Sequence, residues 1–208
     1  MTFTPREALS AAKLCLSAYG EPDAQFAPNI RRANAQALVL TTPLRVAIAG
    51  TNGWQDARQD ADFDLVRVGA QERVHEGFLG HYKTLADDVT AMATAKPIDA
   101  PPLITGHSLG ASVTVLTVWH RTYLFKNGTV YLFGCPGTGD WAFTQSFEFE
   151  CKRNNITVWR IVNRGDPVAA FDARRYCHVG QLVEIGTRWD RAPDHPIREY
   201  IRELESLV

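Results

Sequence analysis

Residues 102–121 read PLITGHSLGASVTVLTVWHR, and this stretch decides the fold class. The run Pro102–Gly106 is short and apolar, as in a buried strand, whereas Ser108–Arg121 has the length and composition of an apolar helix. The change occurs within the GxSxG pentapeptide GHSLG. A strand that turns directly into a helix strains the backbone of its central residue, which small neighbours two positions away permit. The pattern predicts that Ser108 presents its hydroxyl above a sheet as a nucleophile.

Short apolar runs and helical patterns alternate along the rest of the chain. Strands are expected at Ala37–Leu40, Leu44–Ala49, Phe63–Val68, Thr129–Phe133, Thr157–Val162 and Val179–Ile185, and helices at 5–19, Phe78–Met92, Trp141–Lys152 and the C-terminal end. Parallel neighbouring strands need long crossover connections, which these helices supply. The sequence therefore predicts an α/β fold, a three-layer sandwich whose mostly parallel central sheet is flanked by helices.

The first helix carries signals at both of its ends. Thr4-Pro5-Arg6-Glu7 has the form of a capping box, in which the Thr4 hydroxyl serves exposed amide groups and Pro5 takes the first helical position. Gly20 can adopt the left-handed conformation that ends a helix. These signals predict a helix over residues 5–19.

Composition limits the classes of protein to which the chain belongs. Its 208 residues fit one domain, residues 1–208, and 45% hydrophobic with 22% charged residues exclude a disordered chain. The 22 basic and 23 acidic residues leave a net charge of −1, so no overall field attracts nucleic acid. The longest apolar runs are too short to span a membrane. We expect no nucleic-acid partner and at most peripheral contact with lipid surfaces; the oligomeric state stays open.

The cysteines and the N-terminus add two further expectations. Cys15, Cys135, Cys151 and Cys177 form no CxxC pair and no dense disulfide framework, so free and mostly buried thiols are expected, with no metal and no cofactor. Charged and proline residues interrupt the N-terminus where a secretory signal needs an apolar run. The chain is expected to be leaderless, and either cytoplasmic or released by a leaderless route.

A serine hydroxyl needs a base to accept its proton, and histidine is the usual one. Where the nucleophile lies in a GxSxG turn, the chain order is serine, then acid, then histidine. The other histidines precede any suitable acid, which leaves His178 and His195 as candidate bases. His178 opens an apolar run and fits a strand start or a core position. His195 lies in a loop before the final helix, from which a side chain can reach the sheet edge. The pattern favours His195.

The acid must hold the imidazole in the correct tautomer. Asp166 follows the strand Thr157–Val162 by a short turn, which places it at the carboxyl edge of the sheet, where active sites collect. Asp172 and Asp140 are alternatives, and Asp166-Pro167 could instead form an Asx turn. The arrangement favours Asp166 as the acid.

Two backbone amides are candidates for an oxyanion hole. Leu109 begins the helix after Ser108, so its N–H points toward the reacting carbon. A second donor is expected in the loop after an earlier strand, and Gly50-Thr51-Asn52-Gly53 follows the run Leu44–Ala49. Thr51 is the candidate there, and an ordinary turn over 50–53 is the alternative.

Taken together, these segments resemble the class 3 (fungal-type) lipases. The segments that carry the resemblance cover about residues 35–205 in family order: Gly50-Thr51 with Asp60 and Phe63, Val74–Phe78, Ile104–Gly110, Phe133–Pro136 with Gly139-Asp140, Val162–Val168, His178–Gly180 and Asp194-His195. The resemblance implies an α/β-hydrolase fold, a catalytic triad of Ser108, Asp166 and His195, and an oxyanion hole at Thr51 and Leu109. It implies a lipase or esterase that cleaves acyl esters of lipids through an acyl-enzyme. Ala49 and Gly137 depart from the family at positions where arginine is usual.

The resemblance also implies that Asn52–Ala61 forms a lid over the site. The segment is short and polar, with Trp54 as its one large apolar residue. An interfacial lid should expose a broad apolar face. We therefore expect weak interfacial activation and a preference for short or medium acyl esters. Phospholipase or acyltransferase activity, or a non-catalytic lipid-binding module, are the alternatives.

Overall fold

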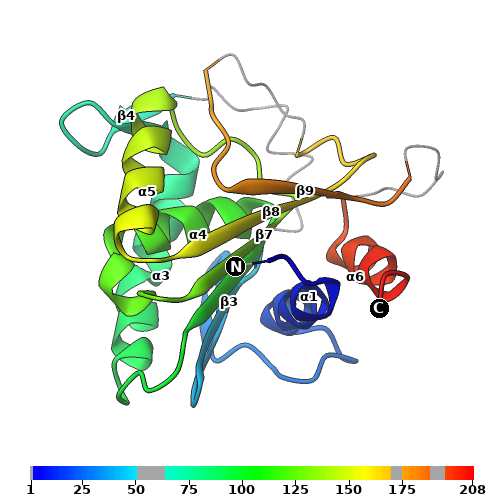
Figure 1. The fold of residues 1–208 in the computed structure, drawn as a ribbon. Helices are drawn as coiled ribbons and strands as arrows, with labels where there is room; N and C mark the ends of the chain where they lie inside the picture. Colours follow the sequence, from blue (N-terminus) through cyan, green and yellow to red (C-terminus); the bar gives the residue numbers. More distant parts are fainter. Residues whose placement is uncertain (1, 51–63, 170–174, 188–194) are drawn as a thin grey trace.

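The computed structural model describes residues 2–50, 64–169, 175–187 and 195–208 (Figure 1). Its described strands form a seven-stranded sheet in the order β1-β2-β3-β6-β7-β8-β9. These strands are β1 (Ile30–Arg32), β2 (Ala35–Thr41), β3 (Leu44–Ile48), β6 (Leu103–His107), β7 (Thr129–Phe133), β8 (Thr157–Asn163) and β9 (Gln181–Ile185). The first three pair antiparallel, whereas β3, β6, β7, β8 and β9 run parallel. The mostly parallel sheet that the alternation predicted is present.

Helices cover both faces of this sheet. They are α1 (Pro5–Tyr19), α3 (Glu76–Ala93), α4 (Leu109–His120), α5 (Trp141–Arg153) and α6 (Ile197–Glu205), with a 3₁₀ turn η1 (Thr122–Leu124) after α4. Figure 1 shows α3, α4 and α5 on one face and α1 with α6 on the other. Strand β7 contributes to both cores, because Val130 and Leu132 pack with the first set while Tyr131 and Phe133 pack with the second. A strand buried on both faces explains why its sequence is continuously apolar.

The structure differs from the sequence-based expectations at three places. The Thr4 hydroxyl donates to Glu7 Oε2 at 2.8 Å and makes no bond to the backbone, so the expected capping box does not form. Strand β1 lies where no strand was expected. A strand was expected over Phe63–Val68, but β4 (Leu65–Arg67) pairs with β5 (Arg73–His75) in a separate two-stranded sheet. Strands β1 and β5, which were not expected, have three residues each and carry too little periodicity to be recognised.

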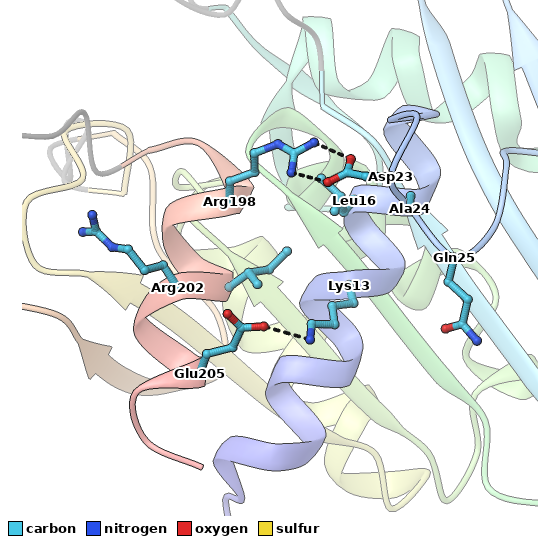
Figure 2. A pocket seen from close by; sticks show the side chains of 9 residues that line it. Lys13, Leu16, Asp23, Ala24, Gln25, Arg198, Arg202 and Glu205 are labelled. Atoms are coloured by element: carbon cyan, nitrogen blue, oxygen red, sulfur yellow. Dashed lines mark hydrogen bonds and ion pairs between the residues drawn. The ribbon is translucent and has the colours of Figure 1, made fainter.

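Helices α1 and α6 lie side by side on the second face of the sheet, with an ion pair between them and another from α6 to the segment that follows α1 (Figure 2). Lys13 pairs with Glu205 at 2.9 Å, and Arg198 pairs with Asp23 at 2.6 Å, both at exposed positions. Exposed pairs contribute only about 0–1 kcal/mol each. The packing of α6 therefore depends mainly on Tyr200 and on Leu204, both fully buried. Within the described residues, no helix combines the length and the apolar character that crossing a membrane requires.

Helix α4 approaches the sheet closely because of two glycines. A Cβ on Gly110 would collide with the backbone carbonyls of Ile48 and Ala49, at the end of β3. A Cβ on Gly106 would collide with the carbonyl of Gly110 itself. The two glycines of the GxSxG pattern therefore let β6, α4 and β3 meet without a gap. This close contact determines the backbone conformation of Ser108, which lies between the two glycines in the sequence.

Replacement of Gly110 by alanine should destabilise the protein, because backbone of β3 cannot move aside as a side chain would. We expect a loss of about 1–3 kcal/mol or more in the free energy of unfolding. Gly80→Ala is the matched control, since Gly80 also lies in a helix but has open space around it. Its gain should be about 0.5–1 kcal/mol from helix propensity. Urea denaturation of both variants measures the difference, and equal effects would contradict this account of the close approach.

Candidate active site

Ser108 occupies the turn from β6 into α4 in a strained conformation. Its φ is 59° and its ψ is −130°, a region that residues other than glycine seldom adopt. Its N–H donates to the carbonyl of Phe133 at the end of β7, at 2.9 Å. The turn is thus tied to the neighbouring parallel strand. The hydroxyl consequently projects from the carboxyl edge of the sheet, as the pentapeptide predicted.

His195 contacts Ser108 directly. Its Nε2 lies 2.8 Å from Ser108 Oγ, although the two residues are far apart in the sequence. Its Nδ1 lies 3.0 Å and 2.9 Å from the two carboxylate oxygens of Asp166. A carboxylate only accepts, so Nδ1 donates and the Nε2 of the neutral ring accepts from the serine. The structure brings the three predicted residues into one hydrogen-bonded chain.

Asp166 is held from several sides. Its Oδ1 accepts from the N–H of Val168 at 2.8 Å, and its Oδ2 accepts from the Tyr200 hydroxyl at 2.5 Å. Burial alone would raise the pKa of Asp166, but the hydrogen bonds from His195 and Tyr200 outweigh it and lower the pKa. The bond from Val168 is an Asx turn, so the structural alternative and the proposed acid coexist at this residue. Asp166 is charged and already oriented toward the imidazole.

Gly134 provides the space that the acid needs. Its φ is 55°, and a Cβ at this position would lie 2.6 Å from Asp166 Oδ2 and 3.3 Å from His195 Cε1. Any side chain would push the carboxylate and the imidazole apart. Neither Gly134 nor Tyr200 was a predicted site residue, because their role depends on contacts across the sheet edge. Each lies close in sequence to a recognised segment, and that proximity was the available signal.

The alternative residues have other positions. Asp140 accepts from Phe143 N–H at 2.9 Å as the cap of α5 and pairs with Arg73 at 2.9 Å. His178 precedes β9, where burial and the Arg160 charge lower its pKa to about 4. Asp172 lies outside the described residues. Of the two candidate bases, His195 is the one in contact with Ser108.

The candidate oxyanion hole is described in part. Leu109 is the first residue of α4, so its N–H is among the helix amides without an intrahelical partner. Thr51 and the expected lid, Asn52–Ala61, lie outside the described residues. Gly50 is described, and its N–H donates to the Tyr19 hydroxyl at 2.9 Å. The amide of Gly50 is therefore committed to Tyr19.

His107 lies beneath the hydrogen-bonded chain and was not a predicted site residue. Its Nδ1 is 2.7 Å from the Tyr19 hydroxyl, and its Nε2 is 2.7 Å from the backbone carbonyl of His195. Burial and the neighbouring His195 lower its pKa to about 3, so the ring is neutral near pH 7. Its position within the GxSxG pattern was the only sequence signal.

Metal-binding clusters are absent from the part of the chain that the structure describes, and Cys15, Cys135 and Cys151 are buried. The described residues contain no group of three or more histidine, cysteine or carboxylate side chains able to hold a metal ion. All four cysteines are free, and burial raises the pKa of Cys15 to about 12 and of Cys135 to about 11. Buried thiols with raised pKa values are poor nucleophiles. The reactive groups at this edge are those around Ser108.

Comparison with known proteins places the chain in a family. A family model described as "Lipase (class 3)" matches residues 45–175. The lipase of Rhizopus microsporus var. chinensis superposes with a TM-score of 0.71 at 23% identity, covering 98% of this chain and 85% of that one. The mono- and diacylglycerol lipase of Aspergillus oryzae gives a TM-score of 0.70 at 16% identity, covering 90% and 81%. At these identities the likeness shows the fold, which is that of the α/β-hydrolases.

A curated relative is similar in sequence over part of its length. Phospholipase A1-IIalpha of Arabidopsis thaliana is 29% identical over 150 residues, which cover 65% of this chain and 32% of the relative. The chain thus aligns with about a third of that protein.

The neutral state of His107 predicts a pH dependence of stability. Its folded pKa of about 3 lies below the ordinary value of 6.5, so the unfolded chain binds a proton first as the pH falls. The associated stability is complete above pH 6.5 and is lost toward about pH 3, at up to about 1.4 kcal/mol per pH unit. Urea denaturation of wild type and His107→Gln at several pH values measures this slope. Equal slopes for the two proteins would refute the prediction.

Proposed function

The chain belongs to the class 3 lipase family, and we propose that it hydrolyses carboxylic esters with Ser108 as nucleophile, His195 as general base and Asp166 as the acid that orients the base. The observation that carries the proposal is the continuous set of hydrogen bonds from Ser108 Oγ through the imidazole to the carboxylate. A binding module without turnover would not need this geometry. The strained backbone of Ser108 also supports a reacting role, because such strain persists where function requires it.

The proposed reaction proceeds in two similar halves. Ser108 Oγ attacks the ester carbonyl carbon while its proton moves to His195 Nε2, which gives a tetrahedral oxyanion. The bond to the alcohol oxygen then breaks, and the alcohol leaves with the proton from Nε2. Water attacks the acyl-enzyme and gives its proton to the same nitrogen. Release of the acid returns that proton to Ser108 and completes the cycle.

The charges of the site suit this sequence of steps. The imidazole becomes positive twice per cycle, and the Asp166 carboxylate beside Nδ1 stabilises that charge. The lowered pKa of Asp166 keeps it ionised. We assign stabilisation of the oxyanion to the N–H of Leu109 and, from the sequence, to that of Thr51. The N-terminal end of α4 adds its partial positive charge at the same point.

The proposed substrates are short or medium acyl esters, because the segment Asn52–Ala61 is polar apart from Trp54. Phospholipid is a second candidate substrate, favoured by one observation. The Arabidopsis thaliana relatives are named phospholipases A1, at 28–29% identity. Both substrates present the same carbonyl to Ser108, so the groups around the carbonyl decide between them.

Replacement of Ser108 by alanine should lower kcat on a soluble nitrophenyl ester by on the order of 10⁴–10⁶-fold, because the attacking oxygen is lost. A fluorophosphonate probe should label wild type and not this variant. Ser10→Ala is the control, since Ser10 is exposed on α1. Full labelling of Ser108→Ala would place the nucleophile elsewhere.

Acyl-chain preference provides a separate test. Across nitrophenyl esters from acetate to palmitate, we expect kcat/KM to be highest for the short and medium acyl chains. The rate should not rise abruptly when the ester concentration exceeds the solubility limit of the ester. A maximum at long chains with such an abrupt rise would contradict the interpretation of the lid. Release of lysophospholipid from phosphatidylcholine vesicles, measured in parallel, would support the phospholipase alternative.

A further inference from the structure

We propose that Tyr19 and His107 form a positioning bridge that fixes the backbone of His195 relative to the end of β3, next to the proposed oxyanion residue Thr51. The inference rests on the proposed function, because it concerns the placement of the base in that reaction. Neither residue touches a reacting atom, so both are positioning residues. We call this pair the Tyr19–His107 bridge.

The bridge is a chain of three hydrogen bonds with a defined direction. The N–H of Gly50 can only donate, so the Tyr19 hydroxyl accepts from it at 2.9 Å. The hydroxyl then donates its own proton to His107 Nδ1 at 2.7 Å. The Nε2 of His107 therefore carries the ring proton and donates it to the carbonyl of His195 at 2.7 Å. Nδ1 therefore accepts and Nε2 donates, which fixes the tautomer of His107.

The bridge passes directly behind the nucleophile. A Cβ on Gly50 would lie 2.6 Å from the Tyr19 hydroxyl and 3.1 Å from Ser108 Cβ, so these groups meet in a space that only glycine leaves open. The His107 ring also packs against the His195 imidazole, with centroids 4.8 Å apart. The rings of Tyr19 and His107 meet edge to face at 5.8 Å. Tyr19, His107 and His195 thus contact one another through ring packing as well as through hydrogen bonds.

Two separate contacts then define where the base lies. Asp166 orients the imidazole of His195 through Nδ1, while His107 holds the backbone carbonyl of the same residue. With the ring alone fixed, the residue could still shift along the direction of Ser108 Oγ. Displacement of a reacting group by about 1 Å can cost roughly 100-fold in rate. The bridge restrains this displacement.

The bridge also depends on the N-terminal helix. Tyr19 is the last residue of α1, and Gly20 ends the helix with a φ of 76°. The segment after α1 is tied to the segment after His195, because Asp23 and Glu21 pair with Arg198 (Figure 2 shows the Asp23 contact). These ion pairs are exposed and weak. The bridge, which ends on the buried His107, is therefore the contact from α1 that can transmit a fixed position to the base.

The first test compares two tyrosine-to-phenylalanine variants. Tyr19→Phe removes the hydroxyl that joins Gly50 to His107. Tyr131→Phe is the matched control, because Tyr131 is a buried tyrosine whose hydroxyl contacts α1 away from the site, donating to Glu7 at 3.4 Å. For a soluble acetate ester, Tyr19→Phe should lower kcat on the order of 10- to 100-fold with KM unchanged. Tyr131→Phe should keep the wild-type kcat.

A second pair of variants tests His107 itself. A glutamine at this position can accept from Tyr19 and donate to the His195 carbonyl, whereas a leucine can do neither. We expect kcat to fall in the order wild type, His107→Gln, His107→Leu, again at constant KM. In wild type, the nitrogen-15 imidazole spectrum should show His107 protonated at Nε2 and unprotonated at Nδ1. The spectrum reports the bridge even where a variant folds poorly.

The outcomes separate the bridge from the proposed function. Equal kcat values for Tyr19→Phe and Tyr131→Phe in an active protein would overturn the bridge, as would a His107 ring protonated at Nδ1. Partial recovery by His107→Gln over His107→Leu supports it. Failure of wild type to hydrolyse any ester would instead count against the proposed function.

Discussion

The close approach of α4 to β3 and β6 is the constraint on which the rest of the site depends. Glycines at positions 106 and 110 leave no side chain between helix and strands, and the connecting residue must then turn within a single step. Ser108 takes up that turn with a positive φ. The strain is maintained because the surrounding sheet is buried on both faces and cannot relax locally. A wider contact would let the serine relax into ordinary backbone and withdraw its hydroxyl from the sheet edge.

The parallel strands then collect the remaining groups. Strands β3, β6, β7 and β8 all end at the same edge, so the residues that follow them become neighbours. Gly50, Ser108, Gly134 and Asp166 each follow one of these strands. Of the three residues in the hydrogen-bonded chain, His195 alone comes from outside this series, from the segment before α6. Its position is therefore the one that the sheet does not determine, and other contacts have to supply it.

Those contacts are buried and polar. Asp166 with Tyr200 holds the imidazole on one side, and His107 with Tyr19 holds the backbone on the other. In a buried setting each hydrogen bond costs more to lose than it would at the surface, so a satisfied network rigidifies its members. The neutral state of His107 also suits the proposed reaction, because a second positive charge beside His195 would disfavour the positive imidazole that the reaction requires.

The sequence by itself determined the order of the helices and of the longer strands, the limits of α1, and Ser108 as the central residue of a strand-to-helix turn. These features are encoded locally, in periodicity and in the backbone demands of glycine and proline. It favoured His195 over His178, and Asp166 over Asp140 and Asp172, without excluding the others, and it assigned no role to Tyr19, His107 or Tyr200. Only the tertiary structure decided those contacts, because they join residues far apart in the chain. Short strands such as β1 were also missed, since three residues carry almost no periodic pattern. The Thr4 hydroxyl bonds to Glu7 and not to the backbone, because the nearby carboxylate competes for it.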